Sequence, residues 1–271
     1  MHGLGNDFMV VDGINQTITL SPEDIQSWSK RNTGIGFDQL LLVEASNAPG
    51  IDFNYRIFNA NGQEVGQCGN GARCLALFLR RYKLTDKNNI IVSTSTTKMN
   101  LLINDDNTVT VNMGKPKLIP QDIPLKADTQ QQLYDIPLKE GKSVGVHAIN
   151  VGNPHALIIV NDIEDADVEI LGSEISKHPV FPHEVNVGLM QIISSNHTKL
   201  RVYERGCGET EACGSGAVAA AALGRLYHQL DDKIKVDLPG GSLVITWSQE
   251  QDDIFLTGPA SFVYEGHLLN A

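Results

Sequence analysis

Residues 58–72 read FNANGQEVGQCGNGA, and residues 203–217 read YERGCGETEACGSGA. At an offset of 145 residues Cys68 aligns with Cys213, and a glutamate, two glycines and an alanine around them align as well. Upstream, GND at 5–7 matches GNP at 152–154, and FDQLLLVE at 37–44 matches EVNVGLMQ at 184–191, both at an offset of 147. Several matches in the same order at nearly constant offset indicate two copies of one domain.

Each copy predicts a helix after the cysteine, followed by strands. Apolar residues recur there at helical spacing, and they are Leu75, Phe78, Leu79 and Tyr82 in the first copy and Leu223, Leu226, Tyr227 and Leu230 in the second. Strand-like segments follow at 90–103 and 108–114, and again at 234–248 and 253–258.

This layout predicts an α+β fold of two pseudo-symmetric lobes, with mainly antiparallel strands and an active site in the cleft between the lobes. We assign residues 1–114 plus 259–271 to the first lobe and 115–258 to the second. Within the second lobe, the proline-rich residues 115–146 are expected to be a connecting region.

Composition excludes several classes of protein. The 271-residue chain is 41% hydrophobic and carries a net charge of −11, which disfavours nucleic acid and anionic membranes as partners. No apolar run reaches the roughly 18 residues of a membrane-spanning helix, and no basic-then-apolar signal sequence opens the chain. With four cysteines and no secretion signal, we expect reduced thiols and a cytoplasmic location.

Cys68 and Cys213 each stand directly before Gly-x-Gly at a predicted helix start. The first N–H groups of a helix lack internal partners, and the helix dipole adds partial positive charge there. We therefore expect the pKa of both thiols to fall from about 8.5 toward neutrality. The same amides can hold a carboxylate, because glycine allows close approach. Each lobe thus offers an acid or base beside an anion site.

Two such cysteines on opposite sides of one ligand suit the inversion of a stereocentre next to a carboxylate. One thiolate removes the α-proton from one face while the other thiol delivers a proton to the opposite face. Helix-terminal donors would stabilise the enolate-like charge, each by about 3 kcal/mol in related sites. Nothing in the sequence indicates pyridoxal phosphate or a metal, so we expect no cofactor.

Zinc is the main alternative use of the cysteines, which form the pairs Cys68/Cys74 and Cys207/Cys213. Five residues separate the members of each pair, whereas structural zinc sites use about two to four. We expect Cys74 to be a small buried hydrophobic residue inside the helix, and we assign no role to Cys207. His155 opens an apolar strand, where a lone histidine is more often structural than catalytic.

Seven motifs span the chain, namely HGLGNDF (2–8), GIGFDQLLLVE (34–44), FNANGQEVGQCGNGARC (58–74), NVGNPHA (150–156), HEVNVG (183–188), YERGCGETEACGSG (203–216) and TGPA (257–260). Together they resemble the diaminopimelate epimerases, which are pyridoxal-phosphate-independent enzymes of lysine and cell-wall biosynthesis. The resemblance implies interconversion of LL- and meso-2,6-diaminopimelate, without a cofactor, in a homodimer whose lobes are curved sheets around a central helix.

The resemblance also assigns roles by position. Cys68 and Cys213 would be the acid/base pair, and His155 and Glu204 would assist proton movement. The substrate-binding positions would be Asn6, Gln39, Asn59, Gly69, Asn70, Asn153, Asn186, Glu204, Arg205, Gly214 and Ser215. Arg205 suits the distal carboxylate, which it can grip in bidentate fashion, and Glu204 can accept from an ammonium. Family chains usually carry several residues before MHGLGNDF, so we expect either a misplaced start codon or a shortened first strand here.

Three other functions remain open. A proline racemase or hydroxyproline epimerase shares the two-thiol chemistry but serves a substrate with one carboxylate, which leaves Arg205 without a use. A non-catalytic carboxylate-binding protein has no need of two activated thiols. A thiol hydrolase needs a Cys–His pair, for which His155 is the plausible partner. As a regulatory hypothesis, Cys68 and Cys213 could oxidise to a disulfide when the site is empty.

Overall fold

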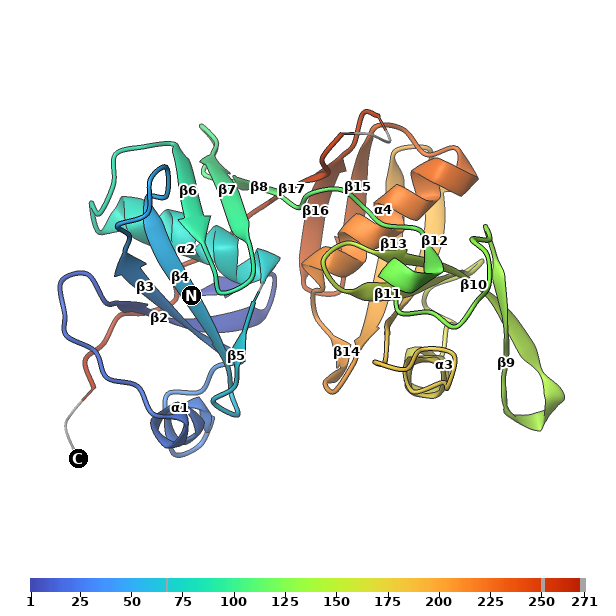
Figure 1. Cartoon of the computed structure of the whole chain (residues 1–271), viewed down its shortest axis with the longest axis horizontal. Coiled ribbons are helices and arrows are strands. Elements are labelled where there is room, and N and C mark those ends of the chain that lie inside the picture. The colour runs from blue at the N-terminus through green and yellow to red at the C-terminus, as the bar shows by residue number, and fades with distance from the viewer. Residues whose placement is uncertain (67, 250–251, 269–271) are drawn as a thin grey trace. The chain divides into compact units, whose positions relative to one another are not determined.

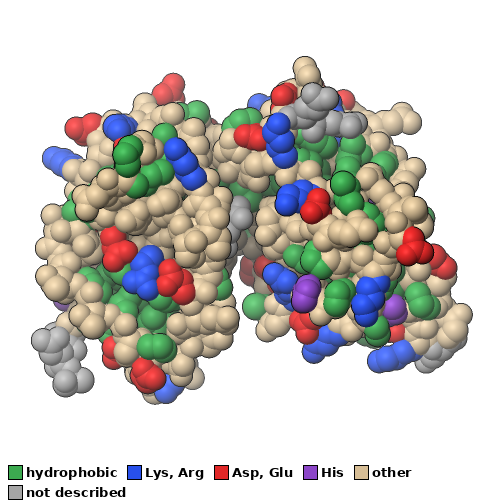
Figure 2. All heavy atoms as spheres, in the orientation of Figure 1, with side chains coloured by type: hydrophobic (Ala, Val, Ile, Leu, Met, Phe, Trp, Pro, Cys, Tyr) green, Lys and Arg blue, Asp and Glu red, His purple; other side chains and the backbone are tan. Residues whose placement is uncertain are grey.

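The computed structural model describes residues 1–66, 68–249 and 252–268. The chain divides into two compact units, Met1–Val111 with Pro259–Ala271 and Asn112–Gly258. In Figure 1 residues 1–111 of the first unit run from blue to green, the second unit runs from green to red, and the described residues from Pro259 on, which belong to the first unit, are red. Among the described residues, no helix is long and apolar enough to cross a membrane. On the face seen in Figure 2, acidic and basic side chains lie interspersed on each unit.

The first unit is built on a mixed β-sheet. Its elements are β1 (His2–Gly3), β2 (Asn6–Asp12), α1 (Pro22–Ser29), β3 (Gln39–Ala45), β4 (Phe53–Asn59), β5 (Glu64–Val65), α2 (Gly69–Arg81), β6 (Asn89–Ser93), β7 (Lys98–Ile103) and β8 (Val109–Asn112). The strands pair in the order β1–β2–β3–β4–β6–β7–β8, and β5 pairs with β4. The pairs β2/β3 and β4/β6 are parallel, and the others are antiparallel.

The second unit repeats this pairing order. Its elements are η1 (Pro120–Asp122), β9 (Tyr134–Pro137), η2 (Lys139–Gly141), β10 (Ser143–Asn150), β11 (Pro154–Ile159), α3 (Val168–Ser176), β12 (Asn186–Ser194), β13 (His197–Glu204), β14 (Gly208–Thr210), α4 (Gly214–His228), β15 (Lys233–Leu238), β16 (Gly241–Thr246) and β17 (Phe255–Gly258). The order is β10–β11–β12–β13–β15–β16–β17, with β14 on β13 and parallel pairs at β11/β12 and β13/β15. The addition is β9, antiparallel to β10. The predicted α+β class of two similar units is confirmed.

Each sheet curves around one helix, as the resemblance implied. Helix α2 contacts β1 and β2 near one edge of its sheet and β7 near the other. A flat sheet could not touch one helix from both edges, so the sheet must curve. Helix α4 likewise contacts strands from β10 to β17. Figure 1 shows α2 and α4 lying across the strands of their own units.

The two central helices bury different surfaces. In α2, Leu75, Phe78 and Leu79 are buried as the helical spacing predicts, and Tyr82 follows the last helical residue. In α4 the six consecutive residues Ala217–Ala222 are all buried, so the helix is buried on every side. Alanine allows the surrounding strands to approach from several sides, so the apolar stripe expected for α4 describes only part of its buried surface. Leu223 and Leu230 are buried, whereas Leu226 and Tyr227 are half-buried.

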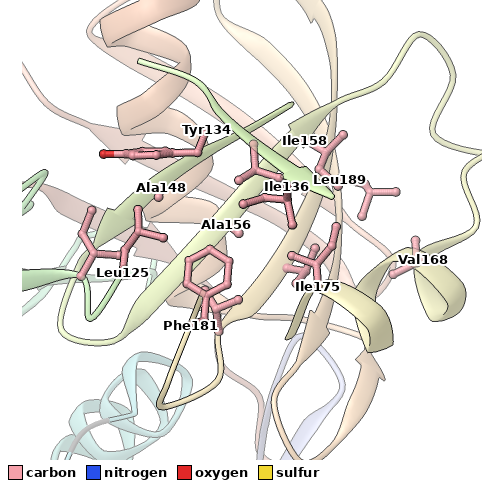
Figure 3. Close-up of a cluster of buried hydrophobic side chains, with 14 of the residues drawn as sticks. Leu125, Tyr134, Ile136, Ala148, Ala156, Ile158, Val168, Ile175, Phe181 and Leu189 are labelled. Atoms are coloured by element: carbon pink, nitrogen blue, oxygen red, sulfur yellow. The ribbon is translucent and has the colours of Figure 1, made fainter. Parts of the chain in front are cut away.

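A second helix covers the opposite face of each sheet. In the first unit, Ile25 of α1 packs with Leu40, Leu42 and Phe58. In the second, Ile175 of α3 packs with strand residues such as Ala156, and Figure 3 shows this cluster. The cluster also contains Leu125, Tyr134 and Ile136, so the proline-rich region 115–146 contributes to the core of the second unit.

Candidate active site

The predicted site residues occupy equivalent positions in the two units. In the first unit Asn6 begins β2, Gln39 begins β3, Asn59 ends β4 and Cys68 directly precedes α2. In the second unit Asn153 directly precedes β11, Asn186 begins β12, Glu204 ends β13 and Cys213 directly precedes α4. The structure therefore brings each set to one end of its own sheet, beside the start of the central helix.

Cys68 is the N-cap residue of α2. Its backbone is extended, with φ −152° and ψ 108°, and its Sγ accepts a hydrogen bond from the Gly71 amide at 3.3 Å. Gly69 and Asn70 are the first two residues of the helix, where amides lack intrahelical partners. The sulfur thus lies in the positive field of the helix start, beside amides suited to an anion.

Gln39 and Asn59 face each other across β3 and β4, because the strand register pairs them directly. Gln39 Nε2 donates to Asn59 Oδ1 at 2.8 Å. Among the described residues, Gln39 Oε1 is buried without a hydrogen-bond partner. A buried acceptor without a partner costs free energy that a donor on a ligand, such as an ammonium group, would recover.

Asn6 and Asn70 are linked side chain to side chain. Asn70 Nδ2 donates to Asn6 Oδ1 at 3.3 Å. Asn70 is buried, whereas Asn6 is partly exposed. The contact places the first turn of α2 against the start of β2, so the two predicted ligand-binding asparagines lie in one place.

Cys213 is the N-cap residue of α4 and is 3% exposed. Its Sγ lies 3.6 Å from the Ser215 hydroxyl. Burial raises the pKa of this thiol well above its ordinary value, and the charge of Glu204 raises it further, whereas the Ser215 hydroxyl opposes the change. The expected fall of the Cys213 pKa toward neutrality is therefore wrong for this structure, because desolvation of the thiolate outweighs the helix start.

His155 lies at the centre of a buried polar cluster. Its Nε2 is 3.0 Å from the Ser215 hydroxyl, 3.1 Å from Asn153 Oδ1 and 3.4 Å from Asn186 Nδ2. Burial lowers the pKa of His155 to about 3, and the charge of Arg205 acts in the same direction. The imidazole is therefore neutral across the physiological range and orients its neighbours by hydrogen bonding.

Glu204 and Arg205 follow one another at the end of β13. Glu204 Oε1 accepts from the Thr210 hydroxyl at 2.7 Å. The backbone N–H of Arg205 donates to Asn186 Oδ1 at 3.0 Å, and its exposed guanidinium donates from Nη1 to the His183 carbonyl at 3.1 Å. The guanidinium has five N–H donors in a fork, so the carbonyl contact leaves it able to bind a carboxylate.

Three further residues contact the sites without having been predicted from the sequence, namely Asp38 and Arg73 in the first unit and Thr210 in the second. Asp38 accepts from Asn6 Nδ2, and Arg73 donates to Asn70 Oδ1. Arg73 carried a usable signal, since it is a charged residue on the otherwise apolar side of a short helix. Thr210 carried none, because its role depends on the β13–β14 pairing.

None of the four cysteines, all of which lie among the described residues, forms a disulfide. Cys74 is fully buried, as expected of a small hydrophobic residue, and burial raises its pKa to about 12. Cys207 is exposed. Within residues 1–66, 68–249 and 252–268, no group of three or more His, Cys, Asp or Glu side chains is arranged to hold a metal ion.

The fold is shared with several solved structures. A PhzF-family phenazine biosynthesis protein from Bacillus anthracis superposes with a TM-score of 0.70 at 16% identity, over 100% of this chain and 95% of its own. A hydroxyproline epimerase from Agrobacterium vitis gives a TM-score of 0.67 at 14% identity, over 97% and 89%. A probable proline racemase from Agrobacterium radiobacter gives 0.69 at 14% identity, over 99% and 92%. The fold class is thus one shared by a phenazine biosynthesis protein, an epimerase and a probable racemase.

Within that class, the chain belongs to the diaminopimelate epimerase family, whose model matches residues 1–119 and 147–263. It is 63% identical over 270 residues to the diaminopimelate epimerase of Legionella pneumophila strain Philadelphia 1, covering 100% of this chain and 98% of the relative. The corresponding enzyme of strain Lens is 62% identical over the same shares. This chain is accordingly an isomerase.

Proposed function

We propose that this protein interconverts LL-2,6-diaminopimelate and meso-2,6-diaminopimelate by two-base proton transfer, with Cys68 and Cys213 acting on opposite faces of one α-carbon. The observation that carries the proposal is the duplicated cysteine, which caps the central helix at the same position of each unit. Membership of the diaminopimelate epimerase family supports the substrate.

The chemistry balances without a cofactor. In one direction the Cys68 thiolate takes the α-proton, and the C–H electron pair remains on the substrate as an enolate-like carbanion. The Cys213 thiol then gives its proton to the opposite face, which leaves Cys68 as thiol and Cys213 as thiolate. The raised pKa of Cys213 supports its starting this direction as the protonated partner. The reverse reaction exchanges the two roles.

The helix starts are suited to the charge that develops on the reacting carboxylate. We assign this stabilisation to the amides of Gly69, Asn70, Gly214 and Ser215, which lie in the first turn of α2 or α4. Donors that are already oriented need no reorganisation at the moment of reaction, and each is typically worth about 3 kcal/mol.

The polar residues are assigned to the two amino-acid ends of the substrate. Gln39 Oε1, which is a buried acceptor, suits an ammonium group. Arg205 suits the distal carboxylate, and Glu204 suits an ammonium. The asparagine positions supply further amide donors and acceptors, and these are Asn6, Asn59, Asn153 and Asn186.

His155 and Glu204 assist the second cysteine in this proposal. His155 holds the Ser215 hydroxyl, which lies 3.6 Å from the Cys213 sulfur. Because His155 stays neutral, it orients that hydroxyl without adding a charge. The negative charge of Glu204 favours the thiol form of Cys213 over its thiolate.

The biological setting follows from this reaction. We propose a homodimer that works in the cytoplasm and supplies meso-diaminopimelate for lysine and peptidoglycan synthesis. A chain whose four cysteines form no disulfide with one another suits a reducing compartment. Light scattering after size-exclusion chromatography tests the dimer, and a single species of about twice the 29.5 kDa chain mass is expected.

The test uses LL-2,6-diaminopimelate in deuterated water with a thiol reductant. We expect inversion with one solvent deuterium entering at the α-carbon. Cys68→Ser and Cys213→Ser should each lose at least about a thousandfold in kcat, because a serine hydroxyl is a far weaker acid and base. Cys207→Ser, at an exposed cysteine outside the proposed site, is the matched control and should retain activity.

Proline and hydroxyproline serve as rival substrates in the same assay, because enzymes acting on them share the fold. Inversion of either, with diaminopimelate unchanged, would reject the proposal in favour of the rival reaction. Deuterium entry that survives in both active-cysteine variants would reject the two-thiol mechanism.

A further inference from the structure

A buried arginine lies behind the first-unit site. Arg73 is 0% exposed, and its Nε donates to the Pro259 carbonyl at 3.0 Å. Its Nη1 donates to Asn70 Oδ1 at 3.1 Å. Within the described residues, Nη2 is buried without a hydrogen-bond partner. The equivalent residue of the second unit, 145 positions later, is Val218, so the repeat does not require a charge here.

An aspartate lies at the other end of the same group of side chains. Asp38 Oδ2 accepts from Asn6 Nδ2 at 2.8 Å and from the Asp7 amide at 3.1 Å. Its other oxygen, Oδ1, accepts from Arg31 Nη2 at 2.8 Å. Asn6 in turn accepts from Asn70. A continuous hydrogen-bonded chain therefore runs from Asp38 through Asn6 and Asn70 to Arg73.

The two end residues of this hydrogen-bonded chain, Asp38 and Arg73, determine the orientation of both asparagine side-chain amides. A carboxylate can only accept hydrogen bonds, and a guanidinium can only donate them. Asn6 must therefore point its NH2 at Asp38 and its carbonyl at Asn70. Asn70 must point its carbonyl at Arg73 and its NH2 at Asn6. Reversing either amide would place acceptor against acceptor at Asp38 or donor against donor at Arg73.

This orientation decides what the amides can offer to a ligand. Both carbonyl oxygens are engaged inside the chain. Asn6 Nδ2 uses one of its two N–H groups on Asp38, so a second N–H belongs to the same nitrogen. Asn6 therefore offers an N–H donor in preference to a carbonyl oxygen, and an N–H donor attracts a carboxylate whereas a carbonyl repels it.

We propose that Asp38 and Arg73 are positioning residues that fix the Asn6 and Asn70 amides so that the second N–H group of Asn6 Nδ2 is available to a substrate carboxylate. The inference rests on the proposed function, since it takes an amino-acid carboxylate as the ligand. It adds to that function two residues that do not touch the substrate and that set the preference for an anionic group.

The kinetics of the Asp38→Asn variant test the role of Asp38 in this hydrogen-bonded chain. The variant side chain can donate as well as accept, so position 38 no longer requires one orientation of the Asn6 amide, and Arg73, acting through Asn70, is left as the group that favours it. We expect KM for diaminopimelate to rise about tenfold, with kcat changed less than about threefold, because ground state and transition state lose the same carboxylate contact.

Arg31→Gln is the matched control for that variant. It breaks the same ion pair with Asp38 but leaves the aspartate as an acceptor for Asn6. Its KM should stay within about twofold of the unmodified enzyme. Equal KM values for Asp38→Asn and Arg31→Gln would overturn the positioning role of Asp38.

Arg73→Lys tests the buried end, because a single ammonium cannot reproduce the guanidinium fork. A KM increase of about tenfold is expected again, and an unchanged KM would count against Arg73.

Neutron diffraction of the unmodified enzyme tests the orientation of the two amides without any variant. It should show deuterium on Asn6 Nδ2 toward Asp38 and on Asn70 Nδ2 toward Asn6, and the reverse arrangement would reject the inference.

These tests separate the two ideas. An unmodified enzyme that leaves diaminopimelate unchanged would refute the proposed function, while the neutron map would still judge the amide orientation. An active enzyme with reversed amides, or with Asp38→Asn kinetics equal to the control, would refute the inference and leave the function intact.

Discussion

Arg201 binds Glu209 in a bidentate ion pair, with Nε 2.6 Å from Oε1 and Nη2 2.8 Å from Oε2. Arg56 binds Glu64 in the same way 145 residues earlier, at 3.2 and 2.8 Å. Each pair joins the strand that ends at the site to the short strand that leads to the capping cysteine. The duplication thus preserves an arginine–glutamate ion pair in each unit. This ion pair holds the short strand that precedes Cys68 or Cys213 against the neighbouring strand.

The two ion pairs should contribute differently to the free energy of unfolding. Arg201 and Glu209 side chains are 27% and 22% exposed, whereas Arg56 and Glu64 are 42% and 32% exposed. Arg201 also donates to the carbonyls of Ile163 and Ala166. We expect Glu209→Gln to lower the free energy of unfolding by about 2 kcal/mol and Glu64→Gln by less than about 1 kcal/mol. Urea denaturation measures both, and equal losses would contradict the assignment.

Gly71 is required because Tyr55 lies beneath the first turn of α2. A Cβ at position 71 would lie 2.5 Å from the Tyr55 hydroxyl oxygen, which is buried and has no hydrogen-bond partner among the described residues. We expect Gly71→Ala to destabilise the protein by about 2 kcal/mol through overpacking.

Tyr55→Phe provides the control for that clash. It removes the hydroxyl and should by itself be neutral or slightly stabilising. In the double variant Gly71→Ala, Tyr55→Phe at least half of the loss should be recovered. Additive effects of the two changes in thermal or urea unfolding would show that the hydroxyl is not the cause.

His155 should make the protein less stable in acid. Its pKa is lowered from 6.5 to about 3 in the folded protein, so the unfolded chain takes up the proton first. The free energy of unfolding must then fall as pH decreases from about 6.5 toward 3. Between pH 7.5 and 5.0 this group alone accounts for about 2 kcal/mol.

The His155 contribution is isolated with His155→Gln. Unfolding free energies of both proteins are measured by urea denaturation at several pH values. The difference between them should shrink by about 2 kcal/mol on going from pH 7.5 to 5.0. A difference that is independent of pH would mean that the folded histidine titrates normally.

Thiol reactivity should follow burial. Cys207 is exposed, whereas Cys213 is 3% exposed and Cys74 is 0% exposed. With iodoacetamide at neutral pH we expect Cys207 to be alkylated at least about tenfold faster than Cys213, because burial and a raised pKa both reduce the reactive thiolate.

Mass spectrometry of peptides from the native protein measures each rate. The Cys213 rate should rise in proportion to hydroxide as pH increases, and it should be unchanged in Cys207→Ser. Fast alkylation of Cys213 at neutral pH would show that its thiol has the lowered pKa first expected from the helix start.

Much of the fold could be predicted from the sequence because each copy of the repeat is marked by short motifs of neighbouring residues. Cys68 and Cys213 each lie a few residues from the glycines and apolar residues that define the helix beside them, so short motifs located both helices. The equivalence of Gln39 and Asn186 was likewise visible, since both begin a strand at a fixed offset. The buried alanine helix α4 was harder to predict, because alanine does not indicate how many strands will surround it.

The sequence by itself determined the duplicated α+β fold, the two capping cysteines and the family, because these depend on residue order within short segments. The tertiary structure decided the electrostatics. The Cys213 pKa rises, His155 stays neutral, and Asp38 and Arg73 orient two asparagines, because burial and hydrogen bonding between residues far apart in sequence set the free energy of each charge. Such distances and exposures arise only when the strands pair and the helices pack against them.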